Sequence, residues 1–208
     1  MTPEDPQQHS PVFTGRLSYG RRWTTVETNA IFDPASIWVM QSIIVPGEQT
    51  NEGVLIESVT LVWRELARQL AADPSLAFRI DAHVWEGIVA AAYKAEGFDE
   101  VILTPRSGDY GRDVIAIKKD FGSIRFIDQV KRYNPEKVIV TADDVRALVG
   151  VLLSDSKATK AFVTTTSDFA PGIMTDPFIS QHIPYRLVLQ NGSALRERIN
   201  RLAVSEQA

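Results

Sequence analysis

The chain has 208 residues, a net charge of −4 and 44% hydrophobic residues, which is typical of a globular protein with one domain, or one domain and an extension. Cysteine is absent, which excludes a disulfide scaffold, a Cys-ligated zinc site and a thiol nucleophile. Because no run of about 18 apolar residues occurs and the polar N-terminus lacks a signal-peptide pattern, we expect a cytoplasmic protein without a membrane partner.

Positive charge is concentrated in the centre of the sequence. Residues 1–100 contain 7 Lys and Arg against 14 Asp and Glu, whereas residues 101–140 contain 8 against 5. A polyanion would therefore bind best at the central segment, since the first half of the chain would repel it. A solvated basic face is the alternative interpretation of the same charges.

Residues 1–75 form the first of two predicted domains, an N-terminal extension. Apolar and β-branched bursts predict short strands near residues 12–17, 23–32 and 37–45, with loops at Pro34 and at Pro46-Gly47. The apolar period then becomes helical, with Leu55, Val59, Val62, Leu66 and Leu70 on one face. This spacing predicts one long helix over residues 51–72, capped by Asn51 and ended by Asp73-Pro74.

Residues 76–208 form the second predicted domain, in which helices and strands alternate. The pattern predicts helices over residues 81–96, 141–153 and 193–203, and a short helix after Pro171. Thr141 to Asp144 resembles a capping box at the start of the second helix, and Ser193 can cap the third. It predicts strands over residues 101–104, 113–118, 124–133, 161–165 and 185–190. The order αβββαβ, followed by a further strand and helix, indicates an α/β fold with a mixed central sheet flanked by helices.

Residues 113–133 are predicted to form a β-hairpin, and its turn determines which residues of the two strands pair. Its turn is Asp120-Phe121-Gly122, a three-residue loop with glycine at the position that needs a left-handed backbone. Centring the turn on Phe121 pairs residues whose numbers sum to 242, so Asp113 lies opposite Gln129. Lys131 follows Gln129 on the same face, because side chains two apart in a strand share a face.

This end of the hairpin carries groups suited to a hard metal ion. The Asp113 carboxylate, the Gln129 carboxamide oxygen and the Val130 backbone carbonyl are oxygen ligands of the kind that Mg²⁺ accepts. A lysine beside the metal, here Lys131, holds a phosphate oxygen or orients an attacking water. The alternative is an ordinary hairpin whose polar rim is exposed to solvent.

Four motifs occur in order in this part of the sequence, and two of them overlap the hairpin. Trp85-Glu86 lies on the helix before it, TPRSGDYGRDVIAI covers residues 104–117, DQVKRY covers 128–133 and FVTTTSDF covers 162–169. Together they resemble the catalytic domain of Mrr-type restriction endonucleases, a branch of the PD-(D/E)xK nuclease superfamily. The resemblance extends from about residue 81 to residue 169, and its motifs are specific in combination.

The resemblance implies a role for each matching residue. Asp113 matches the metal-binding aspartate, and Gln129 stands at the position of the second acidic ligand. Lys131 matches the catalytic lysine, and Glu86 matches the helix glutamate that completes the site through a metal-bound water. The implied cofactor is Mg²⁺, with Mn²⁺ as a substitute. Gln129 removes one charge from the site, so metal affinity should be lower and Glu86 more important.

The resemblance therefore implies a metal-dependent DNA endonuclease of restriction or phage-defence type, similar to type IV enzymes. Candidate phosphate contacts are Arg106, Arg112, Arg132 and Lys137. One such site cuts one strand at a time, so duplex cleavage suggests a homodimer or a larger assembly. Two alternatives remain open: a non-catalytic DNA-binding or assembly module that keeps the nuclease fold, and an RNA nuclease. We expect the three histidines, His9, His83 and His182, to be structural or exposed, because they lack metal-ligand spacing.

Overall fold

A computed structural model describes residues 16–19, 22–25, 43–60, 63–105, 111–120 and 122–205. The chain divides into two compact units, residues 1–32 and residues 33–208. In the first unit, β1 (Arg16–Tyr19) and β2 (Arg22–Thr25) pair antiparallel. They confirm the first two predicted strands in part, and the remainder of those two ranges lies outside the described residues.

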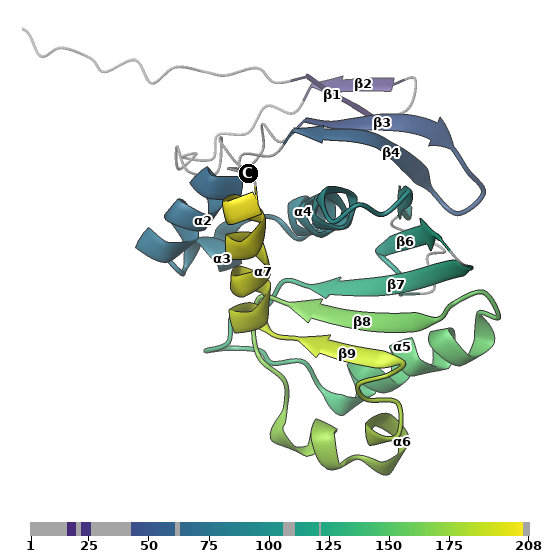
Figure 1. Cartoon of the computed structure of the whole chain (residues 1–208). Helices are drawn as coiled ribbons and strands as arrows, with labels where there is room; N and C mark the ends of the chain where they lie inside the picture. The colour runs from purple at the N-terminus through teal and green to yellow at the C-terminus, as the bar shows by residue number, and fades with distance from the viewer. Residues whose placement is uncertain are drawn as a thin grey trace, which may run out of the picture. The chain divides into compact units, whose positions relative to one another are not determined.

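The second unit contains a seven-stranded sheet whose strands are neighbours in chain order (Figure 1). The strands are β3 (Ile43–Gln49), β4 (Val54–Thr60), β5 (Glu100–Leu103), β6 (Val114–Lys119), β7 (Ser123–Lys131), β8 (Lys160–Thr165) and β9 (Leu187–Gln190). Neighbours from β3 to β7 pair antiparallel, while β7, β8 and β9 run parallel. The sheet is therefore mixed, as predicted.

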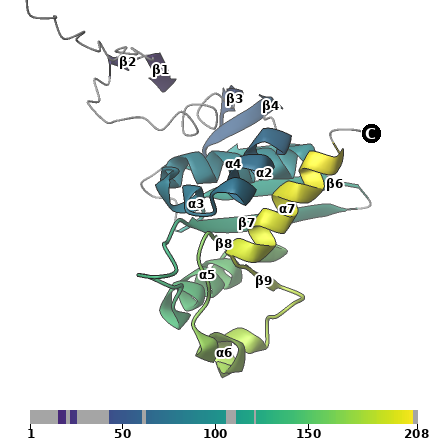
Figure 2. The ribbon, with the colours of Figure 1, turned by 90° about the vertical axis from the view of Figure 1, so that its left-hand side faces the viewer.

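Helices cover both faces of this sheet (Figures 1 and 2). They are α2 (Trp63–Ala72), α3 (Leu76–Arg79), α4 (Ala82–Ala95), α5 (Ala142–Ser154), the 3-10 helix η1 (Pro171–Thr175), α6 (Pro177–Ser180) and α7 (Gly192–Ser205). One hydrophobic core joins α2, α4 and α7 to Val114, Ala116 and Val130, and a second joins α5 and α6 to Ile115 and Ile127. Consecutive residues of β6 and β7 thus face opposite cores, as strand alternation requires.

The predicted order αβββαβ is confirmed by α4, β5, β6, β7, α5 and β8, and the fold is α/β. No helix among the described residues is long and apolar enough to cross a bilayer. Helix α5 begins at the predicted capping box, in which Thr141 and Asp144 each accept from the other's backbone amide. Helix α7 begins one residue early, and its cap is Asn191 rather than the predicted Ser193, because Asn191 Oδ1 accepts from the Ala194 amide over 3.0 Å.

The prediction of one helix over residues 51–72 is wrong in its first half. Residues 54–60 form strand β4, and only residues 63–72 are helical. The segment VLIESVT is apolar and β-branched, and its pairing with β3 and β5 outweighs a helical spacing that only two of its residues support. A short apolar run satisfies both periods, so length and β-branching were the better guides.

The predicted loop at Pro46-Gly47 is also wrong, because both residues lie within strand β3. The β3–β4 register shifts beside Pro46, and β3 is the edge strand, where proline is tolerated. Strand β3 confirms the third predicted strand only at residues 43–45, and residues 37–42 lie outside the described range. The sequence-based boundary at residue 75 falls within the second unit, because β3 and β4 extend the sheet of the later strands.

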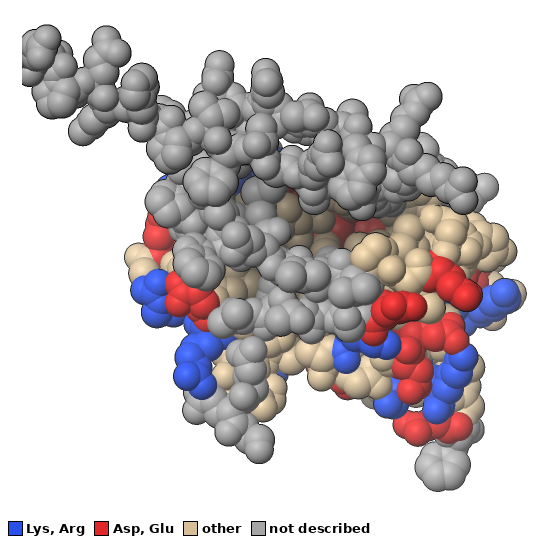
Figure 3. Space-filling model, turned by 90° about the horizontal axis from the view of Figure 1, so that it is seen from above, with Lys and Arg blue, Asp and Glu red and all other residues tan. Residues whose placement is uncertain are grey.

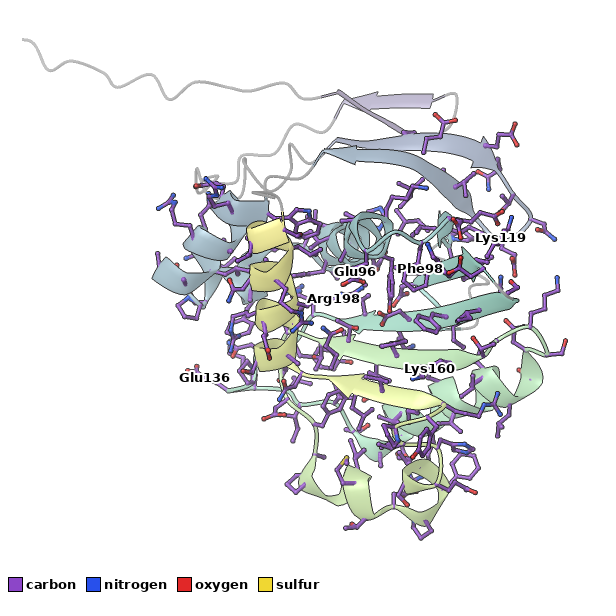
Figure 4. All side chains as sticks on the ribbon, viewed as in Figure 1. Glu96, Phe98, Lys119, Glu136, Lys160 and Arg198 are labelled. Carbon is purple, nitrogen blue, oxygen red and sulfur yellow. The ribbon has the colours of Figure 1, made fainter. Side chains whose placement is uncertain are left out.

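A buried polar network lies between β7 and helix α4. Tyr93 Oη donates to Asp128 Oδ2 over 2.8 Å, and Thr164 Oγ1 donates to the same oxygen over 3.0 Å. Arg198 of α7 stacks on the Tyr93 ring at 4.2 Å and makes two hydrogen bonds, of 2.8 and 2.7 Å, to Glu96 (Figure 4). The network ties α4, β7, β8 and α7 together inside the protein.

Burial raises the pKa of Asp128 to about 7, although Arg198 and the hydroxyls of Tyr93 and Thr164 act in the opposite direction. The nearby charge of Asp113 adds to the rise. In the unfolded chain the same carboxyl titrates near about pH 4. The folded state therefore binds more protons between these values, so the free energy of unfolding falls as the pH rises through that interval.

Replacing the ionisable group tests this account. We expect Asp128→Asn to gain stability relative to the wild type as the pH rises from about 4 to about 8, because the variant never buries a negative charge. Urea denaturation at several pH values measures the difference. Asp99→Asn is the control of opposite sign, because a hydrogen bond from the Lys119 amide holds the pKa of exposed Asp99 below its usual range. A pH-independent difference for Asp128→Asn would contradict the assignment.

Candidate functional site

The predicted hairpin register is confirmed. Ile115 lies opposite Ile127, and Ile117 lies opposite Arg125, so the numbers of paired residues sum to 242. Asp113 comes directly before β6, and Gln129 and Lys131 occupy the last three positions of β7 together with Val130. The start of β6 and the end of β7 therefore lie side by side at one end of the hairpin.

Asp113 contacts the backbone of β7. Its Oδ2 accepts a hydrogen bond of 2.6 Å from the Val130 amide, and its own amide donates to the Asp128 carbonyl over 2.9 Å. The N–H and C=O of one residue in an extended strand point to the same side, so the Val130 carbonyl also points toward the β6 side. The structure thus brings together two of the predicted ligands, the Asp113 carboxylate and the Val130 main chain.

Gln129 lies against the segment that enters β6. A Cβ atom added to Gly111 would lie 2.9 Å from Gln129 Nε2, and Gly111 has φ +76°. The positive φ favours glycine at position 111, and the absence of a side chain there leaves room for the carboxamide. Gln129 Oε1 is buried and has no hydrogen-bond partner among the residues that the structure describes.

Both the main-chain carbonyl and the side-chain ammonium of Lys131 have partners in the structure. Its carbonyl accepts from Thr165 Oγ1 over 2.8 Å and from the Thr166 amide over 3.2 Å. Its Nζ lies 3.8 Å from Asp144 Oδ1, at the first turn of α5. Because Lys131 and Gln129 are two residues apart in β7, both side chains belong to the α5 side of the sheet.

Glu86 lies in helix α4, on the other side of the sheet. Buried residues of α4 belong to the same core as Val114 and Val130. His83 Nδ1 donates to Glu86 Oε2 over 2.7 Å, and the Glu86 side chain is 19% exposed. The structure thus pairs Glu86 with a histidine. The contact of Glu86 with Asp113 or Gln129 that the resemblance implies stays a prediction.

The four candidate phosphate contacts have different surroundings. Arg132 is exposed and donates from Nη1 to the Phe78 carbonyl over 3.0 Å, and Lys137 is also exposed. Arg106 lies outside the described residues. Acidic and basic side chains are interspersed over the described part of the face in Figure 3. A role in DNA binding remains a prediction for all four residues.

Arg112, the fourth candidate, belongs to a cluster of two arginines and two acids. Its Nη1 lies 3.2 Å from Asp155 Oδ2, and Arg125 Nε lies 3.4 Å from the same oxygen. Arg125 also makes hydrogen bonds of 2.5 and 3.1 Å to Glu52. Burial opposes ionisation of Asp155, but the Lys157 amide and the two arginines hold the pKa of Asp155 below its usual range.

A cavity of about 350 Å³ adjoins this cluster and is lined by Glu52, Arg112, Val151, Ser154, Asp155, Ser156 and Lys157. Its lining contains neither Gln129 nor Lys131. The lining contains two acidic residues, Glu52 and Asp155, and two basic residues, Arg112 and Lys157, so neither sign of charge predominates. Arg112 is thus engaged in an ion pair in this structure, next in sequence to the predicted ligand Asp113.

Three residues near the site make contacts that the sequence analysis did not predict. His83 lacks metal-ligand spacing, yet its i, i+3 position relative to Glu86 on a helix was a usable signal. Asp144 was recognised as part of a helix cap, and its proximity to Lys131 depends on the crossover from β7 to α5. Asp128 alternates with the site residues in β7, and only the packing of α4 reveals its burial.

The donor set fits a divalent metal ion in one specific respect. Gln129 Oε1, which is buried and has no partner among the described residues, and the Val130 carbonyl belong to the end of β7, while Asp113 directly precedes β6. All three groups are hard oxygen donors. Among the described residues, no three His, Asp or Glu side chains gather into a metal-binding cluster. The set therefore relies on one carboxylate, one carboxamide and one main-chain oxygen.

The family model Mrr_cat, described as "Restriction endonuclease", matches residues 78–198. This match covers more than half of the chain and begins within a few residues of the predicted second domain. No curated protein matches the chain.

Two solved structures of restriction enzymes are similar to parts of the chain. "MspJI Restriction Endonuclease in Complex with 27-mer Oligonucleotide" aligns with a TM-score of 0.44 and 18% identity over 70% of this chain and 32% of that one. "DNA modification-dependent restriction endonuclease AspBHI" aligns with a TM-score of 0.42 and 14% identity over 70% of this chain and 38% of that one. The aligned part spans only about a third of the length of these two proteins.

Replacing Gln129 by glutamate tests whether its side-chain oxygen is a ligand. Without metal, Gln129→Glu adds a second carboxylate close to Asp113 and should lower the melting temperature through repulsion. With Mg²⁺ bound, the added charge should tighten binding, so Mg²⁺ should raise the melting temperature of the variant more than that of the wild type. Exposed Gln181→Glu is the matched control. Equal Mg²⁺ responses of the two variants would contradict the assignment.

Proposed function

The chain belongs to the Mrr_cat family of restriction endonucleases, and we propose that it is a metal-dependent endonuclease that hydrolyses phosphodiester bonds of DNA. The observation that carries the proposal is the buried Gln129 Oε1, which lacks a partner among the described residues and lies at the strand end shared with Asp113. A buried amide oxygen without a partner is costly, and a bound cation would remove that cost.

Asp113, Gln129 and the Val130 carbonyl are the residues that would hold Mg²⁺ or Mn²⁺. Restriction endonucleases of this family generally use divalent metal ions. Asp113 is already oriented by the Val130 amide, so its carboxylate loses little further freedom on binding a cation. A bound divalent cation would supply Lewis-acid activation of the phosphodiester and of the attacking water.

The chain's own residues would bind and orient the substrate. The Lys131 ammonium would donate hydrogen bonds to a phosphate oxygen and stabilise the charge that grows on it in the transition state. Glu86, held by His83, is proposed to complete the site from the α4 side. Arg132 and Lys137 are exposed beyond the end of β7 and are proposed to contact neighbouring phosphates, with Arg106 and Arg112 as further candidates.

We propose restriction of foreign DNA, and hence antiviral defence of type IV character, as the biological role. The second candidate is a non-catalytic DNA-binding module with the same fold. The amide at position 129 favours this candidate, since it replaces a carboxylate that would bind a cation more strongly. An RNA nuclease would use the same site residues, and the substrate experiment distinguishes the two polymers.

Plasmid DNA with and without base modification, and a structured RNA, are each incubated with the protein and Mg²⁺, Mn²⁺ or EDTA. We expect metal-dependent cleavage of DNA. Asp113→Ala should abolish it, and Lys131→Ala should slow it by a factor on the order of 10²–10³, as removal of a transition-state stabiliser does. Lys160→Ala is the matched control for Lys131→Ala, because Lys160 is half-buried like Lys131 but lies at the start of β8. DNA binding without cleavage under every condition would favour the non-catalytic module, and cleavage of RNA alone would overturn the DNA assignment.

We also propose that the protein acts on duplex DNA as a homodimer or a larger assembly, because one site cuts one strand at a time. Light scattering of the protein with and without a duplex oligonucleotide measures the mass of each species. A mass of two or more chains in the DNA complex is expected. A monomer under both conditions, combined with cleavage of both strands, would contradict the proposal.

A further inference from the structure

The Lys131 ammonium has a fixed counter-charge in helix α5. Asp144 Oδ1 lies 3.8 Å from Lys131 Nζ, and both side chains are 24% exposed. Asp144 itself is immobilised, because its Oδ2 accepts from the Thr141 amide over 2.9 Å and from Thr141 Oγ1 over 2.8 Å. One oxygen of the carboxylate thus caps the helix, and the other faces the lysine.

Most surface ion pairs contribute little because two long side chains lose freedom to form them. Here that cost is reduced on both sides. The capping box holds Asp144, and the hydrogen bonds from Thr165 and Thr166 hold the main chain of Lys131. Only the lysine side chain is left to be ordered, so a single carboxylate is sufficient to bias its position.

We propose that Asp144 is a positioning residue that holds the Lys131 ammonium on the α5 side of the β7 strand end, where it meets the scissile phosphate. This inference rests on the proposed nuclease function. A separation of 3.8 Å is an ion pair and not a hydrogen bond, and an ammonium has three N–H donors. The contact therefore directs the ammonium without using the donors that a phosphate oxygen requires.

The neighbouring residue Asp143 provides a matched control. It lies in the same turn of α5, but its side chain is 89% exposed and pairs with Arg146 rather than Lys131. Asp143→Asn and Asp144→Asn remove the same charge from the positive end of the same helix dipole. Any effect that Asp144→Asn has beyond that of Asp143→Asn comes from the cap or from Lys131.

Steady-state cleavage separates those two causes. We expect Asp144→Asn to lower kcat by about 10- to 100-fold, as misplacement of a reacting group does, with KM for DNA within about twofold of the wild type. Asp144→Glu, which keeps the charge, should recover part of the loss. Asp143→Asn should cleave like the wild type. Equal kcat values for the two Asn variants, or a loss that Asp144→Glu fails to reduce, would overturn the proposal.

A second measurement does not need cleavage. Acetylation of surface lysines by an N-hydroxysuccinimide ester, followed by peptide mass spectrometry, reports how accessible each ammonium is. Labelling of Lys131 relative to Lys137 should rise severalfold in Asp144→Asn and not in Asp143→Asn. Unchanged labelling would overturn the positioning role. If labelling of Lys131 rises in Asp144→Asn but the wild type cleaves no nucleic acid, the proposed function is refuted and the ion pair is not.

Discussion

The alternation of side chains along β7 is the constraint on which both the core on the α4 side of the sheet and the candidate site on the α5 side depend. Consecutive residues of this strand serve opposite purposes: Asp128 is anchored in the α4 core, while Gln129 and Lys131 belong to the α5 side. The strand cannot slip by one position without exchanging these roles. The hydrogen bonds of Asp128 to Tyr93 and Thr164 thus also fix the placement of the two site residues beside it.

Two other elements meet at the end of this strand, and each contributes a carboxylate. The segment before β6 supplies Asp113, whose carboxylate is held by the β7 main chain, and Gly111, against which the Gln129 carboxamide packs. The first turn of α5 supplies a carboxylate near Lys131. Because the groups come from separate elements, their mutual positions depend on the sheet and on the crossover, and not on a local motif alone.

The sequence was most informative where local chemistry decides structure. The glycine of the 120–122 turn and the alternation of β6 and β7 were enough to give the register, and Thr141 with Asp144 gave the start of α5. The failures have tertiary causes. Residues 54–60 satisfy two periodicities, and pairing with β3 and β5 decides between them. The proximity of Asp144 to Lys131 and the burial of Asp128 depend on packing between elements distant in the chain.

The Glu52–Arg125 pair implies that the family region and the folding unit of this protein have different limits. Arg125 lies inside the region that matches the family, residues 78–198, and its side chain is only 5% exposed. Its partner Glu52 lies outside that region, in the turn before β4, where Gly53 lets the main chain approach β5 so closely that an added Cβ would lie 2.0 Å from the Leu103 carbonyl oxygen. A fragment cut at the family limits would keep the buried guanidinium with Asp155 as its remaining acid, and would expose the outer edge of β5. The strands that precede the region matching the family, β3 and β4, therefore belong to the same sheet and cover the outer edge of β5.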